Sequence, residues 1–193
     1  EGERTYYRQT QCLAFGDGMN YVKYENNPVM TPDMLPEGYS AEDFRDPKIW
    51  YEEKEGLYYA IIGASTEEND GAVVLFRSPD LYSWEYVSTL DKGGNEYGYM
   101  WECPDLFRLG DTDFIPILPM KMVAKGNEFH AGNNAAYLAG IYDRETHTFT
   151  RKAIRSIDYG IDFYAPQSTV TPDGRRVMTA WMQTPETMHS QSS

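Results

Sequence analysis

Short apolar stretches rich in Val, Ile, Tyr and Phe recur along the chain, separated by clusters of Gly, Asp and Pro. Clear examples are the stretches 57–62, 72–76 and 114–118. Each has the length of a strand and ends at turn-forming residues, which favours strands over buried helices. Sustained helical periodicity is hard to find along the sequence. The pattern therefore predicts an all-β protein with short loops.

A repeated unit organises these strands: a polar pair, a proline, a strand, a turn and a second strand. It occurs around Pro47, Pro104 and Pro166, which lie 57 and 62 residues apart. Hairpins of a second type lie between the units, and an inner plus an outer hairpin gives the four strands of a propeller blade. We interpret the chain as four successive pieces: an outer hairpin (10–30), two blades (44–90 and 101–154) and an inner hairpin (163–183).

These pieces amount to about three blades, whereas closed propellers typically have about four to eight. An incomplete ring would leave open strand edges and an unclosed core, which is a liability. We therefore expect the 193 residues to form one incomplete propeller domain of a longer protein. Its first partner would then be the missing blades of its own full-length chain.

Composition excludes several classes of protein. The chain has 30 acidic and 17 basic residues, and the resulting charge of −13 would repel a nucleic-acid backbone. No apolar run approaches the roughly 18 residues of a membrane span. The two Cys form no CxxC pair, and His130, His147 and His189 show no metal-ligand spacing, so we expect neither a metal nor a cofactor.

Two carboxylates are the candidates for chemistry. Asp46 and Glu102 precede repeat prolines at corresponding positions, which we expect to be strand starts. The innermost strands of a propeller run in the same direction, so these positions gather at one mouth of the central channel. Two carboxylates in one cavity suit glycoside hydrolysis, although a single acid is more often a solvated surface group. Trp101, beside Glu102, is equally compatible with the core and with a pocket wall.

Three motifs carry a resemblance to a known family. They are Phe44-Arg45-Asp46-Pro47-Lys48, Trp101-Glu102-Cys103-Pro104-Asp105 and the segment 158–167 that ends in Phe163-Tyr164-Ala165-Pro166-Gln167. In order and separation they resemble three signatures of glycoside hydrolase family 32, the β-fructofuranosidases. The resemblance extends from about residue 8 to about residue 186. It implies a five-bladed β-propeller with its active site in the axial pocket, of which this chain holds about three blade-equivalents.

The resemblance also implies roles for individual residues. Asp46 would stabilise the transition state by binding fructose hydroxyls, and Glu102 would be the general acid/base. Arg45 would hold the sugar and fix the Asp46 carboxylate as an ion pair. Tyr164 and Trp181 would pack against the sugar as pocket aromatics.

One departure from the family pattern matters. The family's nucleophile is an Asp in a Trp-Met-Asn-Asp-Pro-Asn-Gly motif on the first blade, and this sequence contains no such motif. We therefore expect the chain to begin within the second blade and to be inactive by itself.

For the full-length protein, the resemblance implies a retaining β-fructofuranosidase. Its substrates would be small sugars: sucrose, sucrose-6-phosphate or fructo-oligosaccharides. A fructosyltransferase of the same family and a non-catalytic fructan-binding propeller are the alternatives, and a purely structural propeller is the weakest. Because the third motif is similar to that of bacterial members, we expect a cytoplasmic location, with secretion as the alternative.

Overall fold

The computed structural model describes residues 7–160 and 162–182, and this part consists mainly of antiparallel strands. A hairpin of β1 (Ala14–Gly16) and β2 (Tyr21–Lys23) comes first, followed by the short 3-10 helix η1 (Pro32–Met34). The predicted all-β class is confirmed. No helix formed by the described residues is long and apolar enough to cross a membrane.

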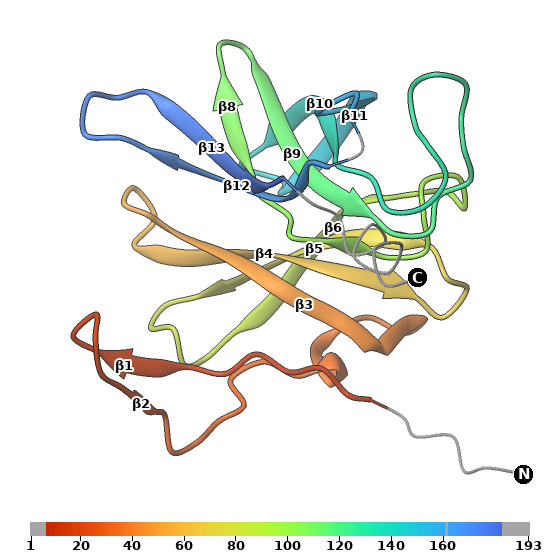
Figure 1. Cartoon of the computed structure of the whole chain (residues 1–193). Helices are drawn as coiled ribbons and strands as arrows, with labels where there is room; N and C mark the ends of the chain where they lie inside the picture. Colours follow the sequence, from red (N-terminus) through yellow and green to blue (C-terminus); the bar gives the residue numbers. More distant parts are fainter. Residues whose placement is uncertain (1–6, 161, 183–193) are drawn as a thin grey trace, which may run out of the picture.

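The first large sheet has four antiparallel strands in the order β3-β4-β5-β6. Its strands are β3 (Tyr39–Glu52), β4 (Leu57–Thr66), β5 (Gly71–Ser78) and β6 (Glu85–Lys92). In Figure 1 this sheet lies between the β1–β2 hairpin on one side and the later strands on the other.

A second sheet has the order β11-β10-β9-β7, and β8 also pairs with β9. Its strands are β7 (Trp101–Glu102), β8 (Phe107–Leu109), β9 (Thr112–Pro119), β10 (Ala136–Asp143) and β11 (Thr148–Ser156). A last hairpin joins β12 (Tyr164–Val170) to β13 (Arg176–Trp181). Residue 183, the end of the predicted inner hairpin, lies outside the described residues, and so does His189.

The expectation that both carboxylates stand at strand starts is wrong. β3 begins at Tyr39 and continues through Asp46, and Glu102 is the last residue of β7. The strand passes Pro47 because its register shifts there, and such a bulge accommodates a residue that cannot donate to the ladder.

The hydrophobic core lies on both faces of the β3–β6 sheet. On one face, Ile61 and Val73 belong to a cluster with Trp101 and Ile117 of the second sheet. On the other face, Phe44, Phe76 and other side chains pack with Met30, which lies between β2 and η1. Burial of both faces explains why β4 and β5 are continuous apolar runs rather than alternating ones. Each fully buried side chain of this size contributes about 1.5–3 kcal/mol to folding.

Candidate active site

Three peptides with an unusual backbone bring the candidate residues together. Asp46, Cys103 and Ala165 each directly precede a repeat proline and have φ values of 61°, 46° and 49°. Positive φ is uncommon for residues other than glycine. The strand register also shifts between Arg45 and Lys48 in β3. Bulges of this kind re-aim side chains, so each repeated unit can direct a side chain toward a common point.

Glu102 is the residue around which the other candidate side chains gather. Its Oε1 accepts hydrogen bonds from Arg45 Nε at 3.2 Å and from the terminal nitrogen NH2 of Arg45 at 3.0 Å. Its Oε2 accepts a hydrogen bond from the Tyr164 hydroxyl at 2.5 Å. The Glu102 side chain is 15% exposed, so these contacts are shielded from most competing water. Residues from β3, β7 and β12 therefore meet around one carboxylate.

Arg45 has partners that sequence analysis missed. Its NH1 donates to Asp43 Oδ1 at 2.6 Å and to Gln9 Oε1 at 3.1 Å. Its ion pairs are thus with Asp43 and Glu102, rather than with Asp46 as expected. Burial alone would lower the pKa of Arg45, but hydrogen bonds and charge from Asp43 and Glu102 raise it above its ordinary value. The guanidinium is a permanent cation here.

Asp46 is joined to Glu102 through the backbone. Asp46 Oδ2 accepts from the Cys103 N–H at 3.1 Å and lies 3.5 Å from Cys103 Sγ. Burial, followed by the nearby charges of Asp46 and Glu102, raises the pKa of the Cys103 thiol to about 12. The thiol is therefore neutral at physiological pH.

The two predicted pocket aromatics differ in their surroundings. Tyr164 is 9% exposed, and burial together with its hydrogen bond to Glu102 raises the pKa of its hydroxyl. It therefore stays protonated and donates. Trp181 is 65% exposed and reaches the cluster through the Tyr164 ring, with the two ring centroids 6.5 Å apart.

Trp101 belongs to the core. It is fully buried, and its Nε1 donates to the Tyr97 carbonyl at 2.6 Å. A Cβ added at Gly63 would lie 2.1 Å from the Trp101 carbonyl oxygen, and one at Gly71 would lie 2.4 Å from the Trp101 ring. The absence of side chains at these two positions lets Trp101 pack directly on the β3–β6 sheet. Because Trp101 directly precedes Glu102, its packing fixes the backbone at the site.

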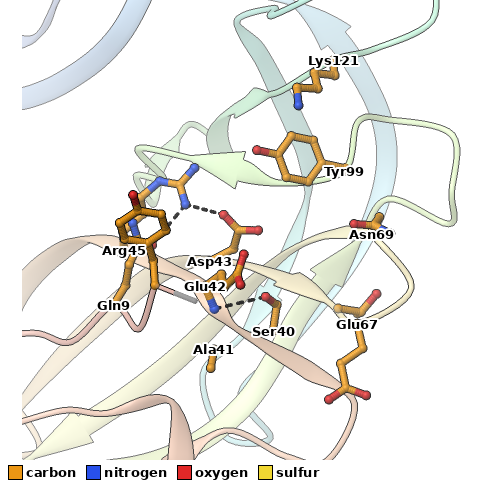
Figure 2. Close-up of a pocket in the computed structure, with 12 residues that line it drawn as sticks. Gln9, Ser40, Ala41, Glu42, Asp43, Arg45, Glu67, Asn69, Tyr99 and Lys121 are labelled. Carbon is orange, nitrogen blue, oxygen red and sulfur yellow. Dashed lines mark hydrogen bonds and ion pairs between the residues drawn. The ribbon is translucent and has the colours of Figure 1, made fainter. Parts of the chain in front are cut away.

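An open cavity of about 1110 Å³ adjoins the cluster at Arg45. In Figure 2 the Arg45 guanidinium and the Asp43 carboxylate point toward each other, and the Tyr99 hydroxyl points toward the same pair. Lys121 and Glu67 also line the cavity. The cavity has both polar and apolar lining, and its volume is large enough for a sugar unit. Within residues 7–160 and 162–182, no group of three or more His, Cys, Asp or Glu could hold a metal ion.

The two cysteines provide a test of this environment on the 193-residue chain. Cys12 is exposed, whereas a pKa of about 12 leaves about one Cys103 thiol in ten thousand ionised at pH 8. We expect iodoacetamide at pH 8 to alkylate Cys12 and to leave Cys103 unmodified, as measured by peptide mass spectrometry. Urea should make both cysteines reactive. Equal alkylation of both in the folded chain would contradict the described environment.

A pair of carboxylates at one site is typical of enzymes that cleave glycosidic bonds. Comparison with known proteins gives the family. A family model described as the glycosyl hydrolases family 32 N-terminal domain matches residues 2–193. The chain therefore belongs to glycoside hydrolase family 32.

Individual relatives agree with this assignment. The sucrose-6-phosphate hydrolase of Bacillus subtilis (strain 168) is 38% identical over 190 residues, covering 96% of this chain and 38% of that protein. The raffinose invertase of Escherichia coli is 37% identical over 182 residues, covering 94% of this chain and 36% of that protein. This chain thus spans well under half the length of these relatives.

Solved structures confirm the propeller class. A family 32 β-fructofuranosidase of Bombyx mori has a TM-score of 0.85 and 40% identity, covering 93% of this chain and 38% of that chain. A variant of the Bombyx mori protein has been solved in complex with sucrose, and it matches equally well. The number of blades in the complete ring stays a prediction.

Proposed function

We propose that this chain forms part of the catalytic propeller of a retaining β-fructofuranosidase. The full-length protein would hydrolyse terminal β-D-fructofuranosyl residues of sucrose, sucrose-6-phosphate or fructo-oligosaccharides. One observation carries the proposal: Arg45 and Tyr164 both donate hydrogen bonds to Glu102. The next residue, Cys103, donates its N–H to Asp46, so both carboxylates belong to one site. The sucrose-6-phosphate hydrolases and the raffinose invertase among the relatives support a fructoside substrate.

In the proposed mechanism, Glu102 transfers protons. A nucleophilic carboxylate that is not in this sequence attacks the anomeric carbon of the fructosyl unit. The bond to the leaving sugar breaks, and Glu102 gives its proton to the departing oxygen. Glu102 then takes a proton from water, and the resulting hydroxide cleaves the fructosyl–enzyme ester. Arg45 and Tyr164 both donate to Glu102 and so hold its carboxyl group in one position through both steps.

Asp46 would act on the sugar rather than on the proton. Its carboxylate binds fructose hydroxyls and places negative charge near the oxocarbenium-like centre of the transition state. Its hydrogen bond from the Cys103 N–H sets its position relative to Glu102. Asp46 and Glu102 thus have different tasks, and they also differ in the repeat, because Asp46 directly precedes its proline whereas Glu102 lies one position earlier.

Substitution of Asp46 by Asn tests this role. Asn keeps the size and can still accept from the Cys103 N–H, but it removes the negative charge. We expect kcat for sucrose in the full-length protein to fall about 100- to 1,000-fold, the typical cost of losing one electrostatic contact to a transition state. Steady-state kinetics measure the change. A matched control is Asp111→Asn in the exposed β8–β9 turn, which should leave kcat unchanged.

The proposed function itself is tested by the products of the full-length protein. Early-time NMR of sucrose hydrolysis should show β-fructofuranose as the first product, as retention requires. The α anomer appearing first would contradict the retaining mechanism. Growth of fructo-oligosaccharides at high sucrose concentration, in place of free fructose, would identify a fructosyltransferase. A cytoplasmic location is part of the proposal, and cell fractionation of a native source checks it.

A further inference from the structure

The backbone of Cys103 makes hydrogen bonds to two strands, β3 and β12. Its N–H donates to Asp46 Oδ2 at 3.1 Å, and its carbonyl accepts from Gln167 Nε2 at 3.1 Å. Cys103 has a φ of 46°, in the left-handed region that is strained for residues other than glycine. Such a conformation persists only where the surroundings impose it. The two hydrogen bonds provide that constraint beside Glu102.

Gln167 is in turn fixed by Lys48. Lys48 Nζ donates to Gln167 Oε1 at 3.2 Å and to the Ser168 carbonyl at 2.8 Å. The Gln167 amide therefore accepts from a lysine on one side and donates to the Cys103 carbonyl on the other. Only a primary amide can do both in this orientation, because a carboxylate has no proton to donate.

A buried carboxylate completes the network behind the site. Asp105 is 2% exposed, and its Oδ2 accepts from the Ser168 N–H at 3.1 Å and from Ser168 Oγ at 2.5 Å. Lys48 Nζ lies 3.8 Å from the same oxygen. A buried charge needs such partners, and a fully satisfied network is rigid. Lys48, Asp105 and Gln167 each directly follow one of the three repeat prolines.

We propose that Gln167, held by Lys48, is a positioning residue for Glu102. It fixes the Cys103 peptide in the left-handed conformation, and this peptide directs Glu102 toward Arg45 and Tyr164. The inference rests on the proposed function, because it assigns Gln167 to the proton-transfer geometry of the same reaction. Without the Gln167 donor, the Cys103 carbonyl is free to turn and Glu102 shifts from its place. A displacement of about 1 Å at a catalytic group costs about 100-fold in rate.

The deciding variant is Gln167→Glu in the full-length protein. Glu keeps the length and the contact with Lys48, but it cannot donate to the Cys103 carbonyl. We expect kcat for sucrose to fall about 10- to 100-fold with KM within about threefold of the wild-type value. The unfolding temperature should stay close to that of Asn127→Asp, a control that makes the same chemical change at an exposed position.

A double-mutant cycle separates positioning from a general structural effect. In a Glu102→Gln background, adding Gln167→Glu should cause no further loss, because the group that Gln167 positions no longer transfers a proton. Full additivity would overturn the inference, and so would an unchanged kcat in folded Gln167→Glu. A wild-type full-length protein that releases no fructose would overturn the proposed function and this inference together. Normal wild-type activity with an unaffected Gln167→Glu variant would overturn the inference alone.

Discussion

The 193-residue chain incubated alone with sucrose should release no fructose above a blank. The family's Asn-Asp-Pro motif is not in the sequence, so the proposed mechanism lacks the nucleophilic carboxylate that would form the covalent intermediate. Removing one member of a cooperating catalytic set loses most of the rate, and we expect at least about 10⁴-fold less activity than in the full-length protein. Enzymatic detection of fructose, at equal molar concentrations of the two proteins, measures the difference.

Two controls make that result decisive. Circular dichroism of the chain should show strand structure, so that a blank reflects chemistry rather than an unfolded sample. The same chain carrying Glu102→Gln should give the same blank. Activity of the unsubstituted chain that disappears in this variant would contradict our expectation, because it would mean that these residues contain a complete catalytic set.

The second large effect is expected for Glu102→Gln in the full-length protein. Gln has the same shape, and its amide oxygen can still accept from Arg45 while its NH2 group donates to the Tyr164 hydroxyl oxygen, but it cannot transfer a proton. We expect kcat for sucrose to fall about 10³-fold, within the typical range for a general acid/base, with a small change in KM. Steady-state kinetics on sucrose check this expectation.

The leaving group provides an internal test of the same variant. An aryl fructoside departs without protonation, so the first step should be largely restored for this substrate while the second, which needs a base, stays slow. A burst of aryl alcohol followed by slow turnover is the expected signature. Glu145→Gln in the exposed β10–β11 turn is the matched control and should behave like the wild type. Near wild-type sucrose hydrolysis by Glu102→Gln would remove Glu102 from the mechanism.

The fold was predictable where burial is two-sided or where turns are clear. β4 and β5 are apolar throughout because neighbours cover both of their faces. The first part of β3 was not predictable, because only Phe44 among residues 39–46 is buried and several of the others face the cavity beside Arg45. The gap between β7 and β8 also has no clear sequence signal, since the repeat indicates a single strand there.

The candidate site was predictable only through repetition. Matched positions before the prolines indicated that Asp46 and Glu102 converge, and the motifs added Arg45 and Tyr164. Asp43 lies two positions before Arg45 in β3 and so shares its face, but its contact was not predictable because the pattern indicates no strand before residue 44. The contact of Gln9 with Arg45 joins positions 36 apart and leaves no local pattern.

The left-handed conformations at Asp46, Cys103 and Ala165 have a thermodynamic consequence. Each costs about 1–3 kcal/mol, and this free energy reduces the stability of the folded protein rather than the affinity for a sugar. The carboxylates are therefore ordered in advance, and substrate binding energy is not consumed in ordering them. The folded protein is therefore less stable than it would be with relaxed backbone at these three peptides, and in return the candidate side chains are positioned before a ligand binds.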